Sequence, residues 1–213
     1  DLCTWPESVP KMMPDFSTAP MLLIIWVVAG YLLGSIPFGI VVARVMGLGD
    51  LRQIGSGNIG ATNVLRTGSK VAAAVTLIAD ASKAGAAVLL ARAVAGEDAA
   101  QLAGFAAIFG HCYPIWLKFN GGKGVATFFG LLFAVAWPIG LAAGITWLIT
   151  ATIFRYSSLS ALVTAAITPL LVIILPYNNL FFLSISLALL VFWRHRENIS
   201  RLLRSQESKI GQK

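Results

Sequence analysis

Apolar stretches separated by short polar turns run along most of the chain. A membrane-spanning helix needs about 20 apolar residues, and about 17 is the usual lower limit. Seven apolar stretches occur, at roughly residues 21–47, 70–96, 100–117, 126–137, 139–154, 157–176 and 179–193. The fourth and fifth of them are short. The pattern predicts an all-α integral membrane protein with about seven transmembrane helices.

The fourth and fifth stretches allow a second interpretation, in which residues 126–154 form one long bent element with Pro138 at the turn. A straight helix of that length would extend about 44 Å at 1.5 Å per residue, well beyond a hydrocarbon core of about 30 Å. We therefore expect two helices here, with Pro138 and later Pro176 as turn signals. An arrangement with five spans remains the alternative.

Composition supports the membrane assignment, and the charges set an orientation. Of the 213 residues, 57% are hydrophobic and 12% are charged, with a mean hydropathy of +0.80, whereas soluble domains carry about 25% charged residues. With seven spans and the N-terminus outside, thirteen of the sixteen lysines and arginines fall in cytoplasmic loops or the cytoplasmic C-terminus, as the positive-inside rule favours. The net charge of +7 is too dispersed for a nucleic-acid-binding surface, so no nucleic-acid partner is expected.

The same pattern divides the chain into three parts. Residues 1–20 hold four of the nine prolines and no apolar run, and we expect them to form a loose external arm or to lie outside the working domain. Residues 21–204 are expected to form a single membrane-embedded domain. Residues 205–213 are expected to form a short cytoplasmic tail.

A polar, glycine-rich segment at residues 50–63 interrupts the apolar pattern. Its glycines allow close backbone approach, and its N–H groups, hydroxyls, amides and Arg52 suit an anion such as phosphate. Gly55 to Gly60 match the dinucleotide pattern G-x-G-x-x-G, but that pattern requires a βαβ unit, and membrane helices flank this segment. Residues from Ala61 onward are expected to begin the next helix, whose N-terminus adds a partial positive charge.

A second glycine-rich segment, Gly121 to Gly124, contains Lys123 just before an expected helix start. A lysine ammonium there can reach a phosphate while backbone N–H groups assist, although it could also be a plain positive-inside anchor. His111, at the end of the preceding span, is expected either to buttress this loop or to take part in chemistry. Both glycine-rich segments and the C-terminus lie on the predicted cytoplasmic side, so they can converge on one site.

Two pairs of residues share helix faces. Asp80 and Lys83 are three residues apart inside a span, where ionisable groups are costly and either mark a site or neutralise each other. His195 and Asn198 are also three residues apart, in the basic segment after the last span, and could act together. Arg194 and the arginines that follow suit anionic lipid headgroups. No cluster of His, Cys and carboxylates has metal-ligand spacing, so no bound metal is predicted.

The polar motifs occur in a fixed order along residues 21–204. They are Gly34-Ser35-Ile36-Pro37-Phe38-Gly39, Asp50-x-Arg52, Gly55-Ser56-Gly57-Asn58-x-Gly60-Ala61-Thr62-Asn63, Asp80-x-x-Lys83, Gly110-His111-x-x-Pro114, Gly121-Gly122-Lys123-Gly124-Val125-Ala126-Thr127 and Arg194-His195-x-x-Asn198-Ile199. This set resembles the bacterial acyl-phosphate-dependent glycerol-3-phosphate acyltransferases. One departure is Ala84, which stands where the family usually has a glycine after the lysine.

The resemblance implies an enzyme of phospholipid synthesis in the bacterial cytoplasmic (inner) membrane, with its active site on the cytoplasmic face. It would transfer a fatty acyl group from acyl phosphate to the 1-hydroxyl of sn-glycerol 3-phosphate, giving 1-acyl-sn-glycerol 3-phosphate and phosphate. Acyl phosphate is already activated, so no covalent acyl-enzyme is required; catalysis can rest on positioning and on relief of charge as phosphate departs. No cofactor is expected, membrane lipid surrounds the protein, and a monomer is expected because one chain holds every motif.

In the light of this resemblance we assign expected roles to residues. The acyl-phosphate head lies in a cradle, with Ser35 nearby, made by Ser56, Gly57, Asn58, Thr62 and Asn63. Arg52, Lys123 and His195 hold the phosphate of glycerol 3-phosphate, and Asn198 orients its hydroxyls. The substrate-binding set is completed by Gly121, Gly122 and Lys83. The acyl tail lies in a groove among the spans that is open to lipid, and either His195 or a substrate phosphate oxygen accepts the hydroxyl proton.

Two other classes of protein fit parts of the pattern. A small transporter could use the glycine loops as half-helix ends around an anion. The Asp80–Lys83 pair favours that class, but the polar motifs gather on one face and the chain has no internal repeat. A non-catalytic scaffold that binds lipid headgroups would not need so many polar loop residues. Phosphate release from acyl phosphate separates the enzyme from both.

Overall fold

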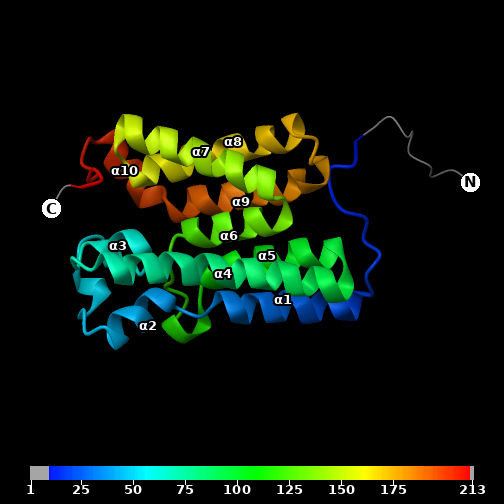
Figure 1. Ribbon diagram of the computed structural model, residues 1–213, viewed down its shortest axis with the longest axis horizontal. Coiled ribbons are helices and arrows are strands. Elements are labelled where there is room, and N and C mark those ends of the chain that lie inside the picture. The colour runs from blue at the N-terminus through cyan, green and yellow to red at the C-terminus, as the bar shows by residue number, and fades with distance from the viewer. Residues whose placement is uncertain (1–9, 212–213) are drawn as a thin grey trace, which may run out of the picture.

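The computed structural model describes residues 10–211 and builds them from helices and loops, without a strand in that range (Figure 1). The α-helices are α1 (Pro20–Gly34), α2 (Phe38–Val45), α3 (Ala61–Leu65), α4 (Lys70–Ala95), α5 (Glu97–Cys112), α6 (Val125–Val135), α7 (Trp137–Phe154), α8 (Ser157–Ile174), α9 (Phe181–Arg194) and α10 (Arg196–Leu203). Short 3-10 turns lie in the connections, at Leu51–Gln53, Ile115–Leu117 and Asn178–Leu180. The predicted all-α class is confirmed.

Four segments of the described chain are long and apolar enough to cross a membrane: Pro20–Val45, Lys70–Ala95, Trp137–Phe154 and Ser157–Ile174. The shorter apolar helix α6 has 11 residues and rises only about 16 Å, roughly half the depth of a hydrocarbon core. The expected division between the fourth and fifth stretches is present, because α6 and α7 are separate helices. It falls at Ala136, and Pro138 occupies the first turn of α7, where its missing N–H costs nothing.

The first apolar stretch, residues 21–47, is not one continuous helix. It breaks between α1 and α2, where Pro37 lacks the N–H that would continue the helical hydrogen bonds. The Ile36 carbonyl at the break accepts a hydrogen bond from Lys83 Nζ of α4 at 2.8 Å. The break therefore gives a buried lysine a backbone partner in the middle of the bundle.

The helix expected from Ala61 onward also divides. The short helix α3 ends at Leu65, and α4 begins separately at Lys70. Ser69 caps this new start, because its Oγ accepts from the Ala72 N–H at 3.1 Å. The glycine-rich segment is therefore followed by a single helical turn and a second loop before the long helix.

Close helix contacts in the core depend on small residues. A Cβ on Gly30 would lie 2.3 Å from the carbonyl oxygen of Ala103, and one on Gly130 would lie 2.0 Å from that of Ala81. Glycine is needed for α1 to approach α5, and α6 to approach α4, at these distances. In Figure 1, α1, α4 and α5 form one layer and α7, α8 and α9 form a second, with α6 packed between them.

The polar segments gather at one end of the bundle, where α2, α3, α10 and the last described residues lie on the left of Figure 1. At the other end, the hydroxyl and N–H of Thr18 donate to the two carboxylate oxygens of Asp98 at 2.6 and 2.9 Å. The Met12 carbonyl accepts there from the Phe182 N–H at 3.3 Å. The described part of the expected arm is therefore docked on helix ends rather than loose. The nine residues before it, and the last two of the expected tail, lie outside the described residues.

Candidate active site

Three polar segments meet at the end of the bundle that carries α3 and α10. They are loop one (residues 50–63), loop two (residues 113–124) and the α9–α10 turn (residues 194–198). Arg52 of loop one donates from its guanidinium to the Asn120 carbonyl of loop two. Lys123 of loop two donates to Asn198 Oδ1 of α10 at 2.5 Å. The convergence expected from the sequence is therefore present in the structure.

Asn63, which is only 2% exposed, organises loop one from within. Its Oδ1 accepts from the Ser56 N–H at 3.1 Å, and its Nδ2 donates to the carbonyls of Leu51 and Asn58 at 2.9 and 2.7 Å. Because both ends of the amide are engaged, the loop is shaped by a side chain of its own sequence. Asn63 therefore supports the loop rather than lining its surface.

The other residues expected to cradle an acyl phosphate lie nearer the surface of loop one. They are the exposed Ser56 and Thr62 and the half-buried Gly57 and Asn58. Gly57 has a φ of +67°, which favours glycine, and its carbonyl accepts from the Arg52 guanidinium at 3.2 Å. Ser35 differs from this group, because it is 1% exposed and its hydroxyl donates to the Tyr31 carbonyl at 2.7 Å.

Loop two is held by groups outside its own sequence. The N–H groups of Gly121 and Gly122 donate to the carbonyls of Cys112 and His111 at the end of α5, at 3.1 and 3.0 Å. The carbonyls of the same two glycines accept from the Arg194 guanidinium of α9 at 3.2 and 3.1 Å. Arg194, expected at the lipid headgroups, thus binds the backbone of loop two instead.

Burial lowers the basicity of two expected site residues. The pKa of Lys123 falls to about 8, first because of burial and then because of the nearby positive charge of Arg201. The pKa of His195 falls to about 4, chiefly because the ring is buried. His195 Nδ1 lies 2.8 Å from the Val191 carbonyl, which only accepts, so Nδ1 carries the proton and Nε2 has a free lone pair. His195 and Asn198 therefore have separate partners.

Glu207 is a site residue that sequence reasoning did not single out. Its Oε1 accepts from Asn198 Nδ2 at 2.6 Å and from the Ser158 hydroxyl at 2.7 Å, and its Oε2 accepts from Arg201 Nε at 2.7 Å. Burial alone would raise the pKa of Glu207, but these hydrogen bonds outweigh it and lower the pKa. Glu207 and Lys123 thus hold opposite groups of the Asn198 amide. The available signal in the sequence is that Glu207 is the single carboxylate of the expected tail, residues 205–213.

Asp80 and Lys83 form an ion pair inside the bundle, with Lys83 Nζ 2.9 Å from Asp80 Oδ1. The same nitrogen lies 2.8 Å from His111 Nδ1 and 2.8 Å from the Ile36 carbonyl oxygen. Three protein partners therefore match the three donors of the ammonium group. Lys83 is linked to loop two through His111, whose carbonyl accepts from the Gly122 N–H. No group of three His, Cys, Asp or Glu side chains within residues 10–211 could hold a metal ion.

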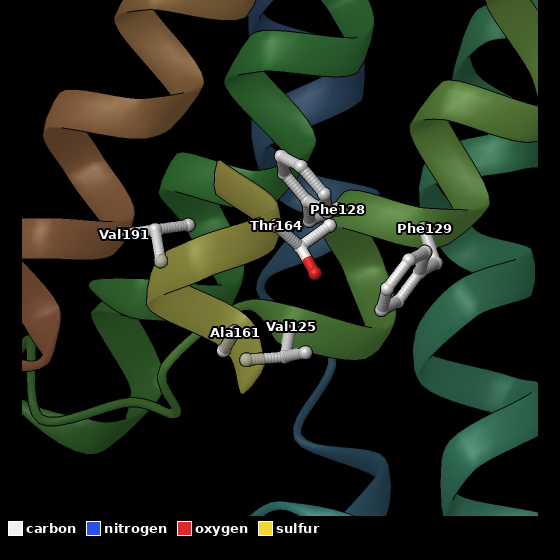
Figure 2. A pocket seen from close by; sticks show the side chains of 6 residues that line it. All are labelled: Val125, Phe128, Phe129, Ala161, Thr164 and Val191. Carbon is white, nitrogen blue, oxygen red and sulfur yellow. The ribbon is translucent and has the colours of Figure 1, made fainter. Parts of the chain in front are cut away.

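Two apolar hollows lie beside the site. Figure 2 shows a narrow crevice in which Phe128 and Phe129 of α6 face Thr164 of α8. A larger groove of about 720 Å³ runs along α5 and α9 and is lined mostly by aromatic and leucine side chains, among them Phe105. Tyr113, at one end of this groove, lies under the Arg194 guanidinium at 4.9 Å from the ring centroid. The groove therefore leads to the residue that binds loop two.

The described residues define an all-helical membrane protein in which polar, glycine-rich loops meet at one end. The family described as glycerol-3-phosphate acyltransferase matches residues 24–205 of the chain. The glycerol-3-phosphate acyltransferase of Ruegeria pomeroyi is 61% identical over 201 residues, which cover 94% of this chain and 99% of the relative. That of Dinoroseobacter shibae is also 61% identical over 201 residues, with the same shares covered.

Solved structures give the same assignment. The chain is similar to the crystal structure of PlsY (YgiH), an integral membrane glycerol 3-phosphate acyltransferase, in its glycerol 3-phosphate form. The TM-score is 0.84 at 38% identity, covering 89% of this chain and 96% of that one. The lysophosphatidic acid form matches with a TM-score of 0.82. This chain belongs to the glycerol-3-phosphate acyltransferase family and is an integral membrane acyltransferase, as its motifs implied.

Proposed function

We propose that this protein transfers a fatty acyl group from acyl phosphate to the 1-hydroxyl of sn-glycerol 3-phosphate. The products are 1-acyl-sn-glycerol 3-phosphate (lysophosphatidate) and inorganic phosphate. The similar crystal structures are of a glycerol 3-phosphate form and a lysophosphatidic acid form, which correspond to an acceptor and a product of this reaction. The observation that carries the proposal is the junction of loop one, loop two and α10, which places Arg52 and Lys123 among amide and hydroxyl groups. Such a junction suits two phosphate-bearing substrates.

The phosphate of glycerol 3-phosphate binds at the loop-two side of this junction. Arg52 and Lys123 supply the positive charge that holds this phosphate. His195, which was expected at the phosphate, has only a lone pair to offer at Nε2 and therefore faces a glycerol hydroxyl instead. Asn198 orients the glycerol hydroxyls, since Lys123 and Glu207 hold its amide in one orientation. Fixed orientation of this kind lowers the entropic part of the barrier for attack on the acyl carbon.

The head group of acyl phosphate binds on loop one, through the loop's N–H groups and the side chains of Ser56, Asn58 and Thr62. Negative charge grows on the phosphate as the acyl–oxygen bond breaks, and preorganised donors stabilise that charge. Asn63 keeps those donors in place from beneath. The acyl group passes directly to the hydroxyl, with no covalent acyl-enzyme, because acyl phosphate is already activated.

The proton of the attacking hydroxyl goes to a phosphate oxygen of the substrate. A general base works best when its pKa is close to the working pH, and the pKa of His195, about 4, is well below neutrality. A phosphate monoester has a second pKa of about 6 and is the better acceptor. His195 Nε2 accepts a hydrogen bond from the hydroxyl and sets its direction.

The acyl tail lies in the groove between α5 and α9. The groove is apolar and about 720 Å³, and it ends beneath Arg194, beside loop two. A chain held there remains in contact with membrane lipid while its head group reaches the polar end of the bundle. Burial of each methylene contributes about 0.8 kcal/mol to such binding.

The membrane arrangement that we propose has seven spans, the N-terminus outside and the active site on the cytoplasmic face of the bacterial inner membrane. Residues 21–204 form one domain that works as a monomer, with residues 1–20 outside and 205–213 as a cytoplasmic tail. Lysines and arginines concentrated at the end that carries α3 and α10 support this orientation.

The test is phosphate release by the purified, detergent-solubilised protein supplied with palmitoyl phosphate, with and without glycerol 3-phosphate. The expected result is release that requires glycerol 3-phosphate and is matched by lysophosphatidate. A folded protein that releases no phosphate would overturn the proposal, and flux of glycerol 3-phosphate into sealed vesicles would then favour a transporter.

A further inference from the structure

We infer that His111 donates a hydrogen bond from Nε2 to a phosphate oxygen of the ligand bound at loop two, and that Lys83 and Asp80 fix the tautomer that makes this possible. Lys83 and Asp80 are positioning residues in this scheme, because they act through His111. The identity of the ligand as a phosphate monoester rests on the proposed function.

The tautomer follows from the buried contacts of Lys83. Its ammonium group lies between the Asp80 carboxylate, at 2.9 Å, and the Ile36 carbonyl, at 2.8 Å, so it remains charged and has only donors to offer. His111 Nδ1, 2.8 Å from Lys83 Nζ, must therefore accept. Asp80 Oδ1 is farther from the same ring nitrogen, at 3.5 Å. The proton of this neutral ring is on Nε2.

The direction of that N–H follows from loop two. A Cβ on Gly122 would lie 2.1 Å from His111 Nε2, so this edge of the ring lies directly against the loop-two backbone, next to Lys123. The Gly122 carbonyl is already bound by Arg194, and no atom within residues 10–211 accepts from Nε2. The ring is 4% exposed, and Nε2 is not among the fully buried side-chain atoms that lack a partner, so this donor can still be reached from outside. A ligand oxygen beside Lys123 would satisfy it.

The two histidines of the chain then have opposite tautomers and opposite roles. His195 keeps its proton on Nδ1, against the Val191 carbonyl, and offers a lone pair at Nε2. His111 accepts at Nδ1 and offers a donor at Nε2. A donor suits a phosphate oxygen, and an acceptor suits a hydroxyl, so the pair distinguishes the two ends of glycerol 3-phosphate without either ring carrying charge.

The first experiment is nitrogen NMR of the full-length protein labelled with ¹⁵N-histidine, with and without glycerol 3-phosphate. Two histidines give two sets of ring signals, and the His111→Gln variant assigns them. We expect His111 protonated at Nε2 and His195 at Nδ1, with the His111 Nε2 signal shifted by glycerol 3-phosphate. Protonation of His111 at Nδ1, or a His111 signal unmoved by glycerol 3-phosphate in an active protein, would overturn the inference. An inactive wild-type protein would instead count against the proposed function.

A matched pair of variants supplies the second test. A glutamine amide can reach the position of the histidine Nε2, whereas an asparagine amide reaches only that of Nδ1. His111→Gln should stay within about threefold of the wild-type KM for glycerol 3-phosphate, and His111→Asn should raise that KM about tenfold, the usual worth of one hydrogen bond. Equal KM values in two variants with wild-type melting temperatures would show that His111 only fills space.

Discussion

Loop one and loop two share a glycine-rich composition but are held in different ways. Loop one is organised by its own Asn63, whose partners are 5 to 12 residues away in the sequence. Loop two is organised by the end of α5 and by Arg194, which is 72 residues from Gly122. A local support keeps its shape when other helices move, whereas a long-range support couples the loop to the packing of α5 and α9. The same chemistry can therefore be placed by local or by tertiary contacts.

The largest expected effect comes from removing the cation of loop two. Lys123→Ala should lower kcat/KM for glycerol 3-phosphate about 10³-fold, because a charged donor to phosphate contributes most in a partly buried site. The measurement is steady-state phosphate release with palmitoyl phosphate. Lys70→Ala, exposed at the start of α4 at the same end of the bundle, is the matched control and should stay within about twofold. Near-wild-type turnover in Lys123→Ala would remove this lysine from the site.

The next variant breaks the local support of loop one. Asn63→Ala leaves the carbonyls of Leu51 and Asn58 without their donor, at a cost of about 1–3 kcal/mol. The KM for acyl phosphate should rise about tenfold to a hundredfold, more than the KM for glycerol 3-phosphate. Gln53→Ala, exposed in the same segment, should change neither. Equal changes in both KM values would mean that loop one does not distinguish the substrates.

The corresponding change at loop two is Arg194→Lys. A lysine keeps the charge but cannot hold the carbonyls of Gly121 and Gly122 with a single planar group. We expect kcat/KM for glycerol 3-phosphate to fall about tenfold, with a smaller change for acyl phosphate. Arg196→Lys, exposed at the first residue of α10, is the control. An unchanged Arg194→Lys enzyme would show that loop two keeps its shape without this support.

The pH dependence tests the state of Lys123. Its pKa of about 8 means that the ammonium is present below this pH and is lost as the pH rises through it. In the free enzyme kcat/KM for glycerol 3-phosphate should therefore fall about tenfold per pH unit above pH 8. In Lys123→Arg the fall should disappear up to pH 10, since a guanidinium stays charged. A wild-type profile that is flat to pH 10 would contradict this role.

The smallest expected effect concerns the groove. Phe105 lies on α5, eight residues before Tyr113, which caps that helix at the site end of the groove. The two residues are therefore about 12 Å apart along the helix axis. Phe105→Ala should shift the preferred acyl phosphate toward longer chains by about twofold in relative kcat/KM, since extra methylenes can then be buried. Phe154→Ala, exposed at the end of α7, should leave the preference unchanged. An unchanged chain-length preference in Phe105→Ala would place the acyl chain elsewhere.

Much of the fold could be predicted from periodicity and length. The stretch at 157–176 corresponds to α8, and the division near Pro138 is present. The break at Pro37 was missed, because apolar residues continue on both sides and conceal the lost hydrogen bond. Arg194 was assigned to lipid headgroups and Glu207 was overlooked, because their partners lie on other helices and loops.

By itself the sequence determined the class of protein, the family and the position of the two glycine-rich polar loops, because apolar length and glycine-rich motifs are local properties of the chain. Only the tertiary structure decided which groups the charged side chains meet: Lys83 with His111, Arg194 with loop two and Glu207 with Asn198. The physical reason is that a buried charge or amide must find partners wherever packing brings them. Sequence periodicity specifies which face is buried but not which neighbour it meets.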